Sequence, residues 1–103
     1  MPKYWISFRV AEVGNHQERR DSIYDAIETL PASSNLWEEP TSFAAFATSE
    51  NRISAVAQKL TAGLDSETDV LIIRKIDFKQ TRVFGVYGDG EKLASLFEGI
   101  EAI

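Results

Sequence analysis

Hydrophobic and polar residues alternate along residues 3–10 of the chain. One set of alternate positions is wholly apolar and consists of Tyr4, Ile6, Phe8 and Val10. The other set combines an aromatic ring, a hydroxyl and a charge, and consists of Trp5, Ser7 and Arg9. A period of two residues is typical of a β-strand whose two faces meet different surroundings. We therefore predict a strand here and expect it to be a central member of its sheet.

A first helix is predicted from about Gln17 to Leu30, because apolar residues recur there at helical spacing and Pro31 cannot continue a helix. Asn15 and Glu18 have the spacing of an N-terminal capping box. The charged residues assigned to the polar face of this helix are Arg19, Arg20, Asp21, Asp25 and Glu28.

Two more helices are predicted further along the chain. The second follows Thr48 or Ser49, either of which could cap it, and has Glu50 in its first turn, where the helix dipole favours a negative charge. Its apolar positions are Ile53, Val56, Ala57, Leu60 and Leu64. The last helix follows a turn at residues 88–90, and its apolar positions are Leu93, Leu96, Phe97 and Ile100.

Four further strands complete the pattern. A short strand at residues 36–39 is predicted at an edge of the sheet, because Pro40 cannot donate a ladder hydrogen bond. Residues 41–48 are predicted to form the next strand, close enough along the chain to pair with residues 36–39 as a hairpin. The continuous apolar run that begins residues 70–76 predicts a well-buried strand, and residues 81–87 predict a fifth strand.

The order strand, helix, strand, strand, helix, strand is the split βαβ arrangement known as ferredoxin-like. We therefore predict a single α+β domain over residues 1–103, a ferredoxin-like βαββαβ antiparallel sheet with an added fifth strand and a C-terminal helix. Right-handed crossovers would place the first and third strands in the middle of the sheet, with the first two helices on one face.

Composition narrows the possible partners. The chain has 11 basic and 16 acidic residues, a net charge of −5, whereas proteins that bind duplex nucleic acid usually present a surplus of Lys and Arg. Cysteine is absent, which excludes disulfides and thiolate metal sites. We expect no signal peptide, because no apolar run follows a basic flank in the first residues, and no apolar stretch approaches 18 residues. We expect a cytoplasmic protein without a membrane or nucleic-acid partner.

Few residues suggest catalytic chemistry. Asp65, Glu67 and Asp69 alternate in a loop and could ligate a hard cation, but the glycine and distal glutamate of an EF-hand are missing, and a solvated loop is favoured. The single histidine, His16, lies near Arg19 and Arg20 and could belong to an anion site, although a surface histidine is favoured. We predict no cofactor.

The face of the first strand that carries Trp5, Ser7 and Arg9 is the other candidate site. The third strand would place beside it either Phe43, Ala45 and Ala47 or Ser42, Ala44 and Phe46. Such a face could stack single-stranded bases, but the third strand lacks the Gly- and aromatic-rich pattern of RNA-binding sheets. Alanines with a few aromatics favour a surface packed against a second subunit.

Residues 4–8 (YWISF) resemble the opening strand of the Cas2-like proteins and their SinR-like relatives, which typically begin Y-x-I-S-Y-D. Residues 40–43 (PTSF), followed by Thr48, resemble the third strand of that family. Residues 64–74 resemble its passage from the second helix to the fourth strand. The similarity spans roughly residues 3–76, and the last helix has no counterpart in the family pattern.

This resemblance implies a ferredoxin-like subunit that dimerises through its sheets, with the fifth strand extending the partner's sheet. It also implies, for some members, metal-dependent cleavage of RNA or DNA by an Asp at the end of the first strand, paired across the dimer. Arg9 stands at that position here, and an arginine cannot ligate a cation. Phe8 replaces a tyrosine as well. We therefore do not transfer the nuclease function.

Three hypotheses of function follow. The first is a non-enzymatic homodimeric interaction or scaffold module without the metal site, for which a protein partner is possible. Its predicted dimer interface comprises Trp5, Ser7, Arg9, Phe43, Ala45, Phe84 and Val86. The alternative is a metal-dependent endonuclease or RNA-processing toxin of the same fold that uses Glu12, Asp65 and Asp69. A monomeric binder of a small ligand or single-stranded RNA is the third, and a C-terminal helix folded over the sheet would also leave a monomer.

We expect no Mg²⁺- or Mn²⁺-dependent cleavage of single- or double-stranded RNA or DNA, because Arg9 occupies the expected metal-ligand position. A nuclease assay on the purified protein tests this. Cleavage that persists through repurification and disappears in Asp65→Ala or Glu12→Ala would contradict the prediction and favour the alternative.

Overall fold

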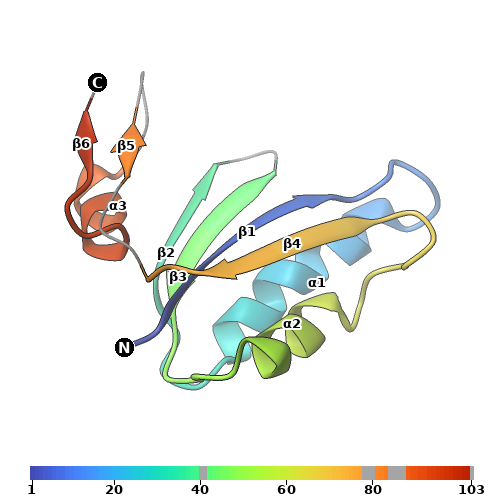
Figure 1. Cartoon of the computed structure of the whole chain (residues 1–103). Helices are drawn as coiled ribbons and strands as arrows, with labels where there is room; N and C mark the ends of the chain where they lie inside the picture. Colours follow the sequence, from blue (N-terminus) through green and yellow to red (C-terminus); the bar gives the residue numbers. More distant parts are fainter. Residues whose placement is uncertain (40–41, 78–80, 84–87, 103) are drawn as a thin grey trace.

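The main body of the molecule is a four-stranded antiparallel sheet with two helices against one face (Figure 1). The computed structural model describes residues 1–39, 42–77, 81–83 and 88–102. The elements of the main body are β1 (Lys3–Arg9), α1 (His16–Thr29), β2 (Ser34–Glu39), β3 (Phe43–Ala47), α2 (Ile53–Thr61) and β4 (Val70–Lys75). The strand order is β2-β3-β1-β4, so β1 is central and β2 lies at an edge, as the sequence predicts.

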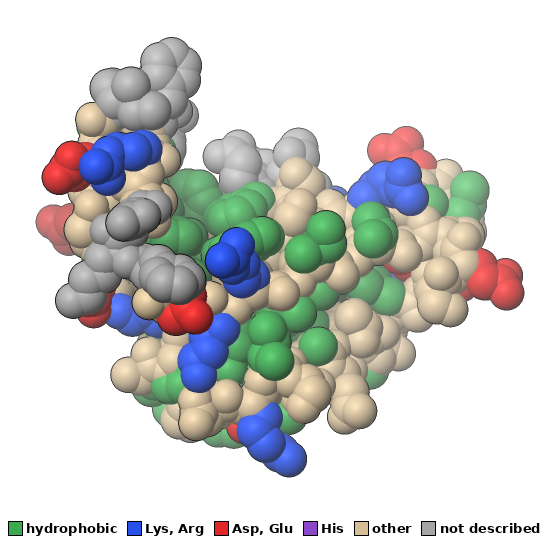
Figure 2. Space-filling model, viewed as in Figure 1, with side chains coloured by type: hydrophobic (Ala, Val, Ile, Leu, Met, Phe, Trp, Pro, Cys, Tyr) green, Lys and Arg blue, Asp and Glu red, His purple; other side chains and the backbone are tan. Residues whose placement is uncertain are grey.

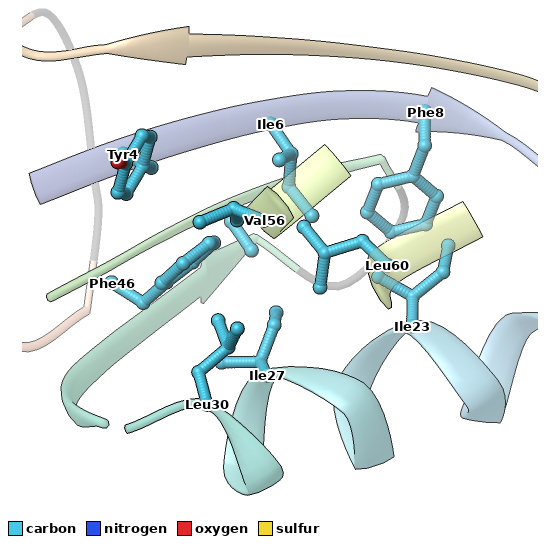
Figure 3. Packing of buried hydrophobic residues seen from close by; sticks show 10 residues of the cluster. Tyr4, Ile6, Phe8, Ile23, Ile27, Leu30, Phe46, Val56 and Leu60 are labelled. Atoms are coloured by element: carbon cyan, nitrogen blue, oxygen red, sulfur yellow. The ribbon is translucent and has the colours of Figure 1, made fainter. Parts of the chain in front are cut away.

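The core lies between the sheet and the two helices. Tyr4, Ile6 and Phe8 point from β1 toward the helices, as Figure 3 shows, and each is at most 3% exposed. Their partners in the same cluster come from α1, β3 and α2 and include Ile23, Ile27, Leu30, Ala44, Phe46, Val56 and Leu60. The apolar set of the period-two pattern in β1 is therefore the buried set, because burial removes its surface from water.

The register between β3 and β1 determines which residues of β3 are part of the core. Ala44 and Phe46 pair with Ile6 and Tyr4 and are fully buried under the helices. Phe43 and Ala45 therefore face the opposite side, next to Ser7 and Trp5. The sequence left open which residues of the third strand share the face of Trp5 and Ser7. In the structure they are Phe43, Ala45 and Ala47.

The starts of both helices differ from the predicted caps. The Asn15 side chain does not cap α1, since its Oδ1 accepts a hydrogen bond from Arg19 Nη1 at 2.6 Å. Residues 48–49 do not cap α2 either, because α2 begins only at Ile53. The Thr48 hydroxyl instead donates to the Pro31 carbonyl at 2.6 Å. This hydrogen bond links the loop after β3 to the loop after α1. Asn15 and Thr48, which could cap these helices, are thus both engaged in other hydrogen bonds.

The prediction that residues 70–76 form a well-buried strand is wrong in part. β4 pairs only with β1 in the four-stranded sheet, so it is an edge strand. Its residues alternate between partly buried and exposed, with Leu71 and Ile73 against the core and Val70 and Ile72 on the other face. A run of apolar residues does not by itself show whether one or both faces of a strand are buried.

The C-terminal unit is a small β-α-β element formed by β5 (Arg82–Val83), α3 (Gly90–Leu96) and β6 (Glu101–Ala102). The two strands pair in parallel with one another, so the described part of β5 does not extend the four-stranded sheet. The rest of the predicted fifth strand, residues 84–87, lies outside the described residues. The Asp89 carboxylate caps α3 by accepting the Lys92 N–H at 3.3 Å. Within the described ranges, no helix has the length and apolar character to cross a membrane.

We expect Gly63→Ala to lower the free energy of unfolding by about 1–3 kcal/mol, the range for overpacking a closely packed site. A Cβ at Gly63 would lie 2.5 Å from Ser22 Oγ and 2.7 Å from Ser22 Cβ of α1. Gly88→Ala is the matched control, because a Cβ there meets nothing within 4 Å. Urea unfolding of both variants tests this, and equal effects would contradict the close approach.

Candidate functional site

The face of the four-stranded sheet that turns away from α1 and α2 is called here the second sheet face. It is built by alternate residues of four strands: Trp5, Ser7, Arg9, Trp37, Phe43, Ala45, Ala47, Val70, Ile72 and Arg74. The pairing register places Ala45 and Arg74 on either side of Trp5, and Phe43 and Ile72 on either side of Ser7. Trp5, Ser7 and Arg9 therefore share this face with Phe43 and Ala45, as the sequence predicts.

An aromatic cluster occupies the centre of the second sheet face. The Trp5 and Phe43 rings stack with their centroids 5.8 Å apart, and the Trp37 ring meets Phe43 edge-on at the same distance. Both geometries are favourable for aromatic pairs. Trp37 also donates from Nε1 to the Gly88 carbonyl at 2.7 Å, which ties β2 to the residues just before α3.

The C-terminal unit covers one end of this face. Leu93, Leu96 and Phe97 are buried in one cluster with Ala45 and Ala47 of β3. The sequence predicts Ala45 in a dimer interface, but α3 already covers it within one chain. The possibility that the last helix folds back over the sheet is therefore realised over this part of the face.

An apolar groove of about 360 Å³ remains between the C-terminal unit and the sheet. It is lined by Trp5, Trp37, Phe43, Thr81, Arg82, Val83, Leu93, Phe97 and Ile100. In Figure 2, hydrophobic side chains gather in the hollow beside the C-terminal unit, and others lie over the region of β4. Trp5 and Phe43 line the groove and also border the part of the second sheet face that the C-terminal unit leaves uncovered. The groove therefore connects the covered part of the face with the uncovered part.

The uncovered part of the second sheet face exposes apolar side chains on β4. Val70 is 46% exposed and Ile72 is 58% exposed. They lie opposite Arg9 and Ser7 across the ladder between β4 and β1. Sequence reasoning missed Val70, Ile72 and Trp37 as residues of this face. The sequence does show that Val70, Ile72 and Arg74 are two residues apart and so share one face of their strand. Which face of the sheet that is follows only from the pairing of β4 with β1.

Arg19 and Asp69 form a buried ion pair at the opposite end of the molecule from α3. Arg19 Nε lies 3.0 Å from Asp69 Oδ2, and the two side chains are 8% and 1% exposed. Nη1 of Arg19 donates to the Val13 carbonyl and to Asn15 Oδ1, and Nη2 donates to the Ala11 carbonyl. The sequence places Arg19 on the polar face of its helix and Asp69 in a solvated loop, and both predictions are wrong.

The Asp69 carboxylate is held ionised by its surroundings. Burial alone would raise its pKa, but the backbone N–H groups of Asp65 and Ala11, followed by Arg19 and Thr68, outweigh burial. The pKa of Asp69 is lowered from 3.8 to about 2. The hydrogen bonds measure 2.9 Å from Asp65 N and 3.1 Å from Ala11 N. Asp69 thus joins the connection after β1 to the connection before β4.

The carboxylates of the nuclease alternative are not brought together for metal binding. Both oxygens of Asp69 are engaged by Arg19 and N–H donors, and the Asp65 carboxylate accepts the Glu67 N–H at 2.9 Å. Glu12 lines a separate cavity near α1. Within residues 1–39, 42–77, 81–83 and 88–102, no group of three His, Cys, Asp or Glu residues is placed to hold a metal ion. Phe84 and Val86 of the predicted interface lie outside the described residues.

Comparison of the sequence with models of protein families and with curated proteins found no match.

We expect Asp69→Asn to lower the free energy of unfolding at neutral pH by about 3–5 kcal/mol, because it leaves the Arg19 guanidinium buried without its counter-charge. The folded-state pKa lies below the unfolded value, so this contribution is complete above about pH 4 and declines as pH falls through about 2. The stability difference between wild type and Asp69→Asn should therefore shrink over that interval.

Urea unfolding at a series of pH values measures this difference. Asp25→Asn is the control, because Asp25 is exposed on the same helix as Arg19. A difference that stays constant down to pH 2 would contradict the role assigned to the ion pair.

Proposed function

We propose that this protein is a ferredoxin-like homodimeric interaction or scaffold module of the Cas2-like kind, which acts without a metal or cofactor. The strand order β2-β3-β1-β4, with α1 and α2 packed on one face, supports the ferredoxin-like part of the proposal. Arg9 at the end of β1 supports the absence of the family's metal site, because a guanidinium repels a cation.

The observation that carries the proposal is the exposure of Val70 and Ile72 on the second sheet face, next to the half-buried Trp5 and Phe43. A sheet with helices on only one face must leave its other face wet or cover it. The C-terminal unit covers the β2–β3 end of this face and leaves the β4 end open. A second copy of the chain is the proposed cover for that end.

The composition of the open end fits a subunit interface. Its central row consists of Ile72, the small Ser7 and Phe43, and the charged Arg9 and Arg74 lie in the rows on either side, next to Val70 and Trp5. A mainly apolar centre with charged residues around it is the usual anatomy of a protein interface. A two-fold axis near Ile72 would bring the same patch from both copies together. The proposed interface therefore centres on β4 and not on Ala45.

We expect the wild-type protein to have a solution mass of twice 11.5 kDa and Ile72→Glu to be a folded monomer. The glutamate would place unpaired charge in the centre of the interface. Because Ile72 is 58% exposed within one chain, the substitution should change the stability of the subunit by less than about 0.5 kcal/mol. Light scattering at several protein concentrations gives the mass, and circular dichroism checks the fold.

Val13→Glu is the matched control, since Val13 is 54% exposed but lies in the connection before α1, outside the sheet. It should leave the dimer unchanged. A wild-type mass of 11.5 kDa at all concentrations would end the dimer proposal. A dimer that survives Ile72→Glu would place the interface elsewhere.

A further inference from the structure

A second cavity, of about 450 Å³, lies beyond the end of β1, between the connection to α1 and the start of β3. Its wall includes Arg9, His16, Gln17, Arg20 and Ser42. The groove next to the C-terminal unit shares none of these residues. The cavity is large enough for a phosphate group together with a small organic part.

Two guanidinium groups line this cavity, and each is placed differently. Arg9 is exposed, and it makes no hydrogen bond or ion pair with any residue in the described part of the chain. Arg20 lies with its Cζ 5.1 Å above the Phe8 ring, so the ring holds its guanidinium plane at the wall of the cavity. Among the lining residues that the structure describes, two arginines stand against one carboxylate, that of Glu12.

The start of α1 borders the same cavity through His16 and Gln17. The first N–H groups of a helix have no partners within the helix and carry partial positive charge. The Asn15 side chain leaves them uncapped, because its oxygen is bound by Arg19. The uncapped helix start therefore adds partial positive charge at the border of a cavity that is also lined by two guanidinium groups.

We propose that this cavity binds the phosphate group of a small phosphorylated molecule. Arg9 supplies the open guanidinium, which can donate two parallel hydrogen bonds to phosphate oxygens. Arg20 and the first turn of α1 provide the remaining positive field. A small ligand is favoured over a nucleic acid, because the chain carries a net charge of −5, which repels a polyanion.

Arg9→Gln should weaken binding of phosphate at least tenfold, because the amide keeps polarity but loses the charge and the fork of donors. The probes are inorganic phosphate and phenyl phosphate, titrated at low ionic strength and followed by the amide and arginine Nε resonances of the protein. We expect saturable shifts at His16, Gln17 and Arg20. Arg52→Gln is the control, since Arg52 is 77% exposed at the start of α2, outside this cavity.

The titrations are made in the Ile72→Glu background as well as in the wild type, so that loss of phosphate binding is separated from loss of self-association. Equal binding by both backgrounds supports a site within one subunit. Shifts that sulfate and chloride reproduce at the same ionic strength would overturn the proposal, as would equal affinities of Arg9→Gln and Arg52→Gln. Binding of a single-stranded oligonucleotide without binding of either phosphate probe would also overturn it.

Discussion

The buried ion pair between Arg19 and Asp69 is the interaction on which the arrangement of the helix–strand connections depends. At this pair of side chains, hydrogen bonds join α1, the connection after β1 and the connection before β4. Loss of one partner from such a pair costs about 3–5 kcal/mol, a large part of the roughly 5–15 kcal/mol that stabilises a small domain. The pair is tolerated because each charged group is hydrogen-bonded, and no buried side-chain polar atom in the described residues lacks a partner.

The same ion pair shapes the cavity at this end of the molecule. Arg19 engages Asn15 and so leaves the start of α1 without a side-chain cap. It also points into the body of the protein, while its neighbour Arg20 turns toward Phe8 and the cavity. Two adjacent arginines therefore face different surroundings, because successive helical residues point in directions about 100° apart.

The other end of the molecule is organised by aromatic packing. Trp5, Phe43 and Trp37 form a cluster on which the C-terminal unit rests, and the Trp37 hydrogen bond to Gly88 attaches that unit to β2. The second sheet face is thereby divided into a covered end over Ala45 and Ala47 and an open end over Val70 and Ile72. The dimer interface proposed for this face falls on the open end, because Val70 and Ile72 are exposed there.

The sequence by itself determined the order of the elements from β1 to β4, the central position of β1 and the residues of its buried face, but not the short strand β6 after the last helix. These follow from local periodicity, since a residue's place in a strand or helix decides which side it faces. The sequence did not determine that Arg19 and Asp69 are buried together, because they lie 50 residues apart and each resembles an ordinary surface charge. Nor could the apolar run at Val70–Ile73 distinguish an edge strand from a central one. Only the tertiary structure decided these points, because burial of a charge or an edge depends on partners distant in the chain.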